Sequence, residues 1–536
     1  MIQKIISATL FSFLCFNVAS AQTGVVDQQA YGYYQDVDRF ATLTNNGSTA
    51  RYAGIGGAAT SLGGDMGSLY VNPAGLGMCR KSEFSFSPVI GYGGTNSSYS
   101  DQLLNKSASN TNNQNDGRVI FGLSNIGLIF SGAKDDLEKG DWRGGSFGIS
   151  FSRTNTFQSQ KSFYGINQNN SMADGFAQQA DGTQSSAFDN NDPSTTSNPS
   201  VPVIANLAYW TYLINPTSAN GSIYSSALSG EDVKQEGTVT TKGAQFAWNI
   251  SYGGNYKDKL YFGASLGIAT IRNIETLNYT ETSGVYAGRK FYPNADTSAL
   301  ISSFTYNDNN TVTGTGVDLK VGIIYKLSDV VRLGTTVKTP TYYWMNNDYN
   351  TTITAYYAPN PLGVSSYSYS TPPGTFSYNF VSPWRISQGI SIFAGKHGFI
   401  SADVEYVPYR SSSLSWDNSY GKSIYDNNTI DNVYRNVFNV RAGGELRLGL
   451  FRLRGGFGYL PTPLYNSSIN RDVIQITGGA GIRLESFYID FSVINNSFNS
   501  SYNAYSLYDN NGSDVAPTAN IKNSQTTLVI STGVYF

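Results

Sequence analysis

The 536-residue chain is poor in the side chains that carry most enzyme chemistry. It has one histidine, His397, and two cysteines, Cys15 and Cys79. We place His397 in a turn, which excludes a Ser-His-Asp triad inside the molecule, and one histidine cannot surround a metal ion with imidazole ligands. The sequence therefore predicts no enzyme activity, no catalytic residue, no metal site and no cofactor.

Charge is also scarce, because charged residues make up 13% of the chain compared with about 25% in an average globular domain. The formal net charge is −2 at pH 7. A nearly neutral chain offers no basic surface to nucleic acid. We expect no nucleic-acid partner.

Long apolar runs are missing beyond the first twenty residues. A membrane helix needs about 18 consecutive apolar residues, and the only candidate run, residues 5–18, is shorter. This run follows Lys4 and precedes the small residues Ala19-Ser20-Ala21, which is the pattern of a secretory signal peptide. We expect residues 1–21 to be removed, which leaves Cys79 without a disulfide partner.

What the chain does contain is aromatic side chains and glycine. Aromatic residues make up 14% of the chain, with 39 Tyr and 29 Phe, and there are 56 Gly. Low charge, abundant aromatics and export without a membrane helix are together typical of a transmembrane β-barrel.

Apolar residues recur with a period of two along most of the chain. In one stretch, Leu260, Phe262, Ala264, Leu266 and Ile268 share a face. The same alternation recurs near residues 317–325, 400–406, 438–448 and 451–459. A half-exposed strand of a soluble sandwich gives this pattern in any single run. In a membrane barrel, the apolar face contacts lipid and the polar face lines the lumen.

The spacing of the connections favours the barrel. Tight turns alternate with long polar joints such as residues 165–242 and 497–524, as in outer-membrane barrels with short periplasmic turns and long outer loops. We predict an all-β, antiparallel barrel of about 14 strands, near residues 84–93, 118–131, 144–163, 243–255, 259–281, 309–326, 331–357, 376–394, 398–416, 433–448, 451–460, 473–485, 487–496 and 525–536.

Most of the charged residues in these strands alternate with apolar ones. An Arg or Lys facing lipid costs ~2–4 kcal/mol at the bilayer midplane, so we expect the charges to face the lumen. A wet, charged lumen favours either a porin for polar solutes or a route in which a hydrophobic ligand leaves through the wall. The inward set comprises Asp318, Lys320, Arg332, Lys338, Asp403, Glu405, Arg441, Glu445, Arg447, Arg452, Arg454, Arg483, Glu485 and Asp490.

The stretch "ARYAGIGGAATSLGGDMGSLYVNPAGLG", followed by "KSEFSFSP", resembles the N-terminal hatch of the FadL-type outer-membrane transporters of long-chain fatty acids and other hydrophobic compounds. The hatch signature matches Asn72, Pro73, Ala74 and Gly75. Later stretches, such as "GTGVDLKVGIIYKLSDVVRLG", are also similar, so the resemblance covers nearly the whole mature chain.

The resemblance implies a monomeric barrel in the cell outer membrane, surrounded by outer-membrane lipid. Residues 22–83 would form the N-terminal tail and a hatch inside the lumen, and residues 84–536 would form the barrel with its outer loops. Outer loops would capture fatty acids or other hydrophobic small molecules, the hatch would gate them, and they would leave laterally through the wall. The alternative is a FadL-like barrel that docks exported or envelope proteins.

Three further groups of residues are candidate sites. Within the long joint, Leu207, Trp210, Tyr212, Leu213 and Ile214 form an apolar island that we interpret either as an outer capture site or as a cap on the barrel rim. By analogy with the family, the lateral gap falls where the alternation weakens, at Arg153, Thr154, Asn155, Thr156 and Phe157. The last strand ends in Tyr535 and Phe536, which resembles the signal read by the barrel assembly machinery.

Overall fold

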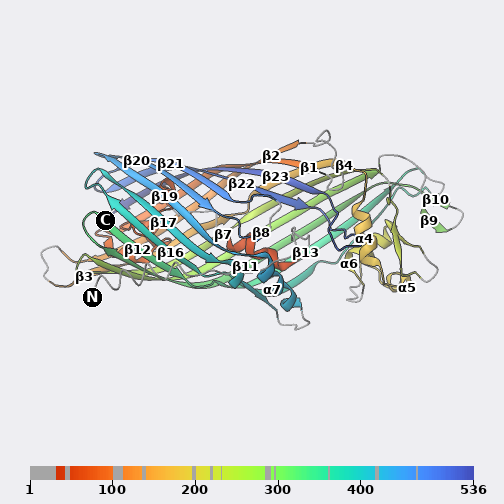
Figure 1. The fold of residues 1–536 in the computed structure, drawn as a ribbon, viewed down its shortest axis with the longest axis horizontal. Helices are drawn as coiled ribbons and strands as arrows, with labels where there is room; N and C mark the ends of the chain where they lie inside the picture. The colour runs from red at the N-terminus through yellow and green to blue at the C-terminus, as the bar shows by residue number, and fades with distance from the viewer. Residues whose placement is uncertain are drawn as a thin grey trace.

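The computed structural model describes residues 32–42, 49–100, 113–135, 140–195, 201–217, 221–230, 232–283, 291–294, 297–359, 363–416, 422–465 and 469–536. The predicted signal peptide, residues 1–21, lies outside them. One antiparallel sheet closes on itself, because β1 (Glu83–Ser100) pairs with β2 (Asn113–Ala133) on one side and with β23 (Thr518–Tyr535) on the other (Figure 1).

The closed barrel has 14 wall strands, as the sequence predicts. Several of them consist of two consecutive segments. In order around the wall after β1 and β2 they are β3 (Trp142–Thr156) with β4 (Ser159–Asn167), β7 (Val233–Tyr256), β8 (Leu260–Ser283), β11 (Ile301–Lys326), β12 (Val331–Lys338) with β13 (Tyr342–Tyr357), β15 (Gly374–Val381) with β16 (Arg385–Phe393), β17 (Gly398–Pro408) with β18 (Ser413–Ser415), β19 (Asn436–Leu448), β20 (Phe451–Leu460), β21 (Val473–Arg483), β22 (Phe487–Asn503) and β23.

Side chains alternate between an apolar outer face and a polar inner face. In the C-terminal half of β11, Val317, Leu319 and Val321 are exposed, whereas Asp318 and Lys320 between them are buried. The same alternation recurs around the wall, so the outer surface is an apolar band of the kind that faces lipid. The predicted inward direction of Asp318 and Lys320 is confirmed. Glu485, also predicted to face inward, is instead exposed in the turn between β21 and β22, because β21 already ends at Arg483.

The wall is much taller on one side than on the other. Strands β7, β8 and β11 have 24, 24 and 26 residues, whereas β20 and β21 have 10 and 11. About 9–11 residues suffice to cross a bilayer. The joint expected over residues 165–242 is therefore shorter than predicted, because β4 extends to Asn167 and β7 already begins at Val233.

Short helices gather at the end of the barrel toward which the long strands β7, β8 and β11 extend, on the right of Figure 1. They are α4 (Met172–Ala180), α5 (Ser185–Asp189) and α6 (Val203–Trp210). Their apolar side chains pack with those of the wall into one core that includes Phe176, Leu207, Phe304 and Tyr357. Within the described part of the chain, no helix is both long and apolar enough to cross a membrane.

Two stretches that precede β1 pack against the inward side chains of the wall. The N-terminal segment (residues 32–42) contains η1 (Tyr33–Gln35) and α2 (Asp36–Ala41). The hatch segment (residues 49–81), named for its predicted role, contains α3 (Ala50–Gly54), η2 (Met66–Leu69) and η3 (Pro73–Met78). η3 contacts β7, β8 and β11, while α3 contacts β20 to β23 across the barrel.

Candidate functional site

The hatch motif forms the start of η3. The Oδ1 atom of Asn72 accepts a hydrogen bond from the backbone nitrogen of Ala74 at 3.1 Å, and Pro73 occupies the first helical position, where its fixed φ fits. The Nδ2 atom of Asn72 donates to the carbonyl oxygen of Thr60 at 2.7 Å. Longer contacts reach the wall carbonyls of Ile323 (3.4 Å) and Thr335 (3.5 Å). Asn72 therefore joins two parts of the hatch segment to each other and to β11 and β12.

Two wall glycines allow this close approach. A Cβ atom on Gly263 of β8 would stand 2.4 Å from the carbonyl carbon of Pro73, and one on Gly322 of β11 would stand 1.9 Å from the Oδ1 atom of Asn72. Ala74 is fully buried against Tyr261 and Ile324. Any larger residue at the two glycines would push the hatch segment off the wall.

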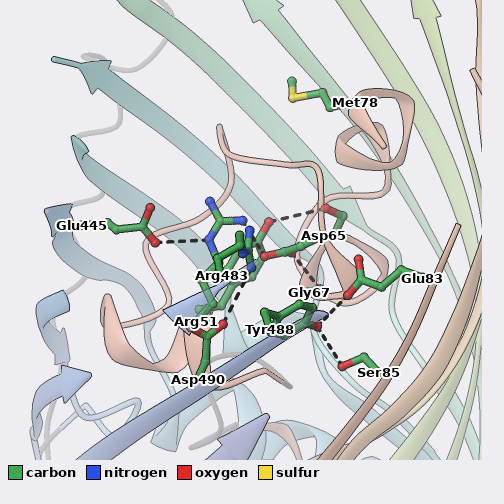
Figure 2. A network of polar contacts seen from close by, with 12 residues as sticks. Arg51, Asp65, Gly67, Met78, Glu83, Ser85, Glu445, Arg483, Tyr488 and Asp490 are labelled. Carbon is green, nitrogen blue, oxygen red and sulfur yellow. Dashed lines mark hydrogen bonds and ion pairs between the residues drawn. The ribbon is translucent and has the colours of Figure 1, made fainter. Parts of the chain in front are cut away.

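Arg51 of α3 enters a network of buried ion pairs with the short side of the wall (Figure 2). Its Nη1 atom lies 2.7 Å from Asp65 Oδ2, and its Nε atom lies 3.5 Å from Glu445 Oε2. Glu445 also pairs with Arg454 at 2.9 Å, and Arg454 pairs with Asp490 at 2.7 Å. Burial works to lower the pKa of Arg51, but the charges of Asp65 and Glu445 raise it well above its usual value. Arg51 thus stays charged and holds α3 to the wall.

The middle of the hatch segment is tied to β16 and β17. Thr60 donates two hydrogen bonds to Asp403 Oδ2, from its backbone nitrogen at 2.8 Å and from its hydroxyl at 2.7 Å. The hydroxyls of Ser61 and Ser391 are 2.6 Å apart. Polar contacts therefore fasten this segment at several points around the lumen.

The N-terminal segment lies beside the hatch segment in an apolar and aromatic cluster. Phe40 meets Phe157 edge-on, with ring centroids 5.7 Å apart. The buried carboxylate of Asp36 accepts a hydrogen bond from the hydroxyl of Tyr378, and Arg39 lies 3.6 Å away. Burial raises the pKa of Asp36 to about 6, although Arg39 and the Tyr378 hydroxyl work to lower it.

Backbone pairing between β2 and β3 joins residues 125–133 of β2 to residues 144–152 of β3. It ends at the pair Asn125–Ser152, and beyond that point, toward the outer loops, β4 pairs with β7. Nearer the outer loops, the carboxylate of Asp116 on β2 accepts hydrogen bonds from the backbone nitrogen of Ser162 (2.6 Å) and from Gln160 Nε2 (3.1 Å) on β4. Between these two points, among the described residues, backbone pairing does not join the two edges.

The residues predicted for the lateral gap lie at this point. Arg153, Thr154, Asn155 and Phe157 are buried and Thr156 is half-buried, so the in–out alternation stops as the strand turns into the lumen. Thr95, which faces inward on β1, donates from its hydroxyl to the carbonyl oxygen of Gln160 at 2.7 Å, which places the start of β4 on the inner side of β1.

Two cavities flank the turned strand. The larger, of about 110 Å³, is lined by the N-terminal and hatch segments and by β3, β7, β8, β11 to β13, β16, β17 and β19. The smaller, of about 30 Å³, is lined by β1, β2, β3, β22 and β23. Thr154 lines the larger cavity, whereas Arg153 and Thr156 line the smaller one. The segment 153–156 therefore borders both spaces.

The apolar island of the long joint forms α6 and the residues after it, but it is not one exposed surface. Leu207, Leu213 and Ile214 are fully buried in the outer core, and Trp210 and Tyr212 are half-buried. Of the two interpretations of the island, a cap on the barrel rim fits these three buried residues, because the tall wall supplies an inner face against which α6 packs. Any capture role rests on Trp210 and Tyr212.

The terminal aromatic residues differ in their exposure. Tyr535 packs against Tyr488, with ring centroids 5.7 Å apart. Phe536 is 66% exposed, and its backbone nitrogen donates to the carbonyl oxygen of Ser82 at 3.0 Å. His397 lies in the turn between β16 and β17, as predicted.

A closed barrel with an apolar exterior and inward charges is a transmembrane β-barrel of the outer-membrane type. Among solved structures, a Pseudomonas aeruginosa FadL homologue resembles it with a TM-score of 0.51 and 13% identity, over 92% of this chain and 99% of that one. This likeness shows that the barrel has the FadL-type fold, which the sequence resemblance predicts.

Two toluene transporters are similar at lower scores. TodX from Pseudomonas putida has a TM-score of 0.47 and 14% identity over 96% of this chain and 100% of that chain. TbuX from Ralstonia pickettii has a TM-score of 0.46 and 15% identity over 92% and 99%. No protein-family model matches the sequence, and no curated protein matches it significantly.

The sequence offered no signal for the larger cavity. Its polar lining comes from positions far apart in the chain, including Gln245, Thr336 and Asp403, which only barrel closure brings to one space. In the sequence, each of them looks the same as any other inward-facing residue of an alternating strand.

Proposed function

We propose that the chain is a passive transporter of the cell outer membrane for long-chain fatty acids or other hydrophobic molecules. The observation that carries this proposal is the end of the β2–β3 ladder at Asn125–Ser152, directly beside the smaller cavity. An unpaired stretch of wall next to an internal space gives a hydrophobic molecule a lateral route into the bilayer, away from the charged lumen below.

In this proposal the ligand enters from the outer loops, where Trp210 and Tyr212 contribute the exposed part of the capture site. It occupies the larger cavity, passes residues 153–156 and leaves through the gap. The hatch segment closes the axial route, and its contacts with β7, β8 and β11 on one side and β20 to β23 on the other support that role.

The remaining assignments follow from the same proposal. The chain acts as a monomer without catalytic activity, in contact with outer-membrane lipid. Tyr535 and Phe536 form the segment that the barrel assembly machinery reads. The exposure of Phe536 supports this role, because little in the folded barrel requires an aromatic residue there.

The proposal is tested by filling the smaller cavity. Thr156→Trp would place a large ring between the larger cavity and the gap, and Thr156→Ser is the matched small change at the same position. Uptake of radiolabelled oleate, dodecanol and toluene by cells that carry each variant is compared, and heat-modifiable gel mobility reports barrel folding.

We expect Thr156→Trp to fold and to reduce uptake to the level of cells without the protein, while Thr156→Ser transports normally. Equal uptake by both variants would overturn the lateral route. If the wild-type barrel transports none of the compounds but co-purifies stoichiometrically with another envelope protein, the docking scaffold replaces the transporter.

A further inference from the structure

The short turns of the barrel lie together at the end opposite the helices α4 to α6 (Figure 1). They connect β2 to β3, β7 to β8, β11 to β12, β16 to β17, β19 to β20 and β21 to β22. The start of β1 and the end of β23 meet at the same end. We call this surface the turn rim, and its described residues are 80–82, 134–135, 140–143, 256–260, 326–332, 394–398, 447–452 and 483–486.

The turn rim is strongly basic, although the formal net charge of the whole chain is −2. None of the charged side chains among its described residues is buried. The basic ones are Arg80, Lys81, Lys134, Arg143, Lys257, Lys259, Lys326, Arg332, Lys396, Arg447, Arg452 and Arg483, and the acidic ones are Asp135, Asp141, Asp258, Asp329 and Glu485. Residues 136–139 of the β2–β3 connection, which lie outside the described residues, add one basic and two acidic residues to the sequence. Thirteen basic residues against seven acidic ones leave a surplus of six positive charges at this end.

Ion pairs use only part of this charge. Within the turn rim they join Arg80 and Arg143 to Asp258, Lys257 to Asp141, and Lys326 to Asp329. Three exposed lysines, Lys81, Lys259 and Lys396, have no ion-pair partner among the residues that the structure describes. Lys81 donates to the carbonyl oxygen of Glu485 at 3.0 Å, which leaves its charge uncompensated.

Two of these lysines have an exposed apolar residue close by on a neighbouring segment. The carbonyl oxygen of Lys259 accepts a hydrogen bond at 2.8 Å from the backbone nitrogen of Lys326, and the next residue, Leu327, is 54% exposed. The residue that follows Lys81 accepts a hydrogen bond at 3.0 Å from the backbone nitrogen of Phe536, whose side chain is also mostly exposed. Cation and apolar side chain therefore occur together in both places.

The third lysine repeats this arrangement. Phe393, three residues before Lys396, donates from its backbone nitrogen to the carbonyl oxygen of Val330 at 2.8 Å, and Val330 is 50% exposed. Exposed apolar residues in a turn are unfavourable in water but fit the boundary of a bilayer. A lysine beside them keeps its alkyl stem in the apolar layer while its ammonium group reaches the head groups. The turn rim therefore lies at the level of the lipid head groups.

The three lysines are spread around the wall instead of converging on one point. The strands β11 and β12 separate the β7–β8 turn of Lys259 from the β16–β17 turn of Lys396. Lys81 contacts the β21–β22 turn, beyond β19 and β20. A small soluble anion needs several cations around one point, whereas separate cations above an apolar band suit separate amphiphiles, each with one anionic head group.

We propose that the turn rim binds anionic phospholipids, such as phosphatidylglycerol, in the bilayer leaflet at that end of the barrel. The ammonium groups of Lys81, Lys259 and Lys396 contact the phosphate oxygens, and the acyl chains lie along the apolar outer wall. Basic residues close to a membrane surface are attracted to anionic lipid. The proposal goes beyond transport and requires only that the barrel spans a bilayer.

The test compares two lipids that have identical acyl chains. The purified full-length barrel in neutral detergent is titrated at low ionic strength with dioleoyl phosphatidylglycerol or with dioleoyl phosphatidylethanolamine, which has no net charge, and native mass spectrometry counts the lipids that stay bound. The rim variant combines Lys81→Gln, Lys259→Gln and Lys396→Gln. The control variant makes the same charge change at exposed residues near the other end of the barrel, which also have no ion-pair partner among the described residues: Lys242→Gln, Arg410→Gln and Lys522→Gln.

We expect the wild-type barrel to bind phosphatidylglycerol about fivefold more tightly than phosphatidylethanolamine. The preference should fall when salt is added, because salt screens exposed charges. The rim variant should lose most of the preference, and the control variant should keep it. All the changed side chains are exposed, so heat-modifiable gel mobility should remain that of the wild type.

Three results would overturn the proposal. They are equal binding of the two lipids by the wild type, an undiminished preference in the rim variant, and displacement of phosphatidylglycerol by inorganic phosphate, which would indicate a site for small anions. Each leaves the proposed transport function standing, because uptake of hydrophobic molecules is measured separately.

Discussion

Asn155 of β3 donates a hydrogen bond from its side-chain nitrogen to the carbonyl oxygen of Thr42, over 3.2 Å. Two residues further along, the ring of Phe157 packs edge-on against Phe40. The strand that leaves the wall is thereby attached to the N-terminal segment beside the residues that border both cavities. Movement of one element must strain the contacts of the other.

Cutting this attachment should release the N-terminal segment. In Asn155→Ala, loss of one buried hydrogen bond should cost about 1 kcal/mol and increase the undocked fraction about fivefold. Trypsin cleaves after Arg39 only when the segment leaves the wall, so the rate of that cut is the measurement. Asn495→Ala is the control, because Asn495 pairs with Ser524 and Thr526 on another part of the barrel. Equal cleavage rates in all three proteins would show that Asn155 does not restrain the segment.

Docking of the N-terminal segment should weaken as the pH rises. Asp36 has a pKa of about 6 when docked and 3.8 as a free side chain, so the docked form binds the proton more tightly. The associated stabilisation is fully present below about pH 4 and is lost as the pH rises through about 6, by up to about 3 kcal/mol at 1.36 kcal/mol per pKa unit. Amide exchange of α2, corrected for intrinsic rates, should show greater protection at pH 5 than at pH 8. Asp36→Asn, which cannot ionise, should remove that difference; a difference that persists would assign it to another group.

Asn72→Leu should loosen the hatch segment without preventing barrel assembly. The change leaves the carbonyl oxygen of Thr60 and the backbone nitrogen of Ala74 without partners, at a cost of about 1–3 kcal/mol. We expect wild-type amounts of heat-modifiable barrel but a higher nonspecific conductance in planar bilayers, and altered uptake of hydrophobic compounds. If conductance and uptake both match the wild type, the motif is only a turn.

Arg51→Met should destabilise the attachment of α3 more than any exposed charge change. It leaves Asp65 without its guanidinium partner in a buried site, and breaking a buried pair from one side costs about 3–5 kcal/mol. The temperature of the heat-modifiable gel shift should fall. Adding Asp65→Asn should restore part of the loss, because the second change removes the unpaired charge; additive losses in the double variant would contradict the coupling.

Phe536→Ala should affect assembly more than stability. Because the side chain is mostly exposed, the folded barrel should lose no more than about 0.5 kcal/mol. We expect less barrel in the outer membrane of cells that express the variant, while the protein that does assemble unfolds at the wild-type temperature. A parallel fall in unfolding temperature would assign Phe536 a structural role instead.

The number of wall strands and most of their positions follow from local pattern. Period-two alternation identifies every wall strand near its true place, and β20 matches its prediction at both ends. The largest errors lie at the outer ends of β1, β7, β11, β22 and β23, where polar residues continue the strands beyond the lipid. There the apolar signal stops although the backbone ladder continues, because the side chains outside the bilayer meet water and the packed helices.

Alternation and the avoidance of charge in lipid are properties of neighbouring residues, so the sequence alone determined the barrel and the inward direction of Asp318 or Arg454. The capture residues show the limit of this reasoning, because Leu207 and Ile214 are apolar in the sequence whether they face solvent or a core. Only the tertiary structure decided that they are buried and that Gln245, Thr336 and Asp403 share one cavity. Each of these depends on which distant strands the closed barrel brings together, and period-two alternation carries no information about that.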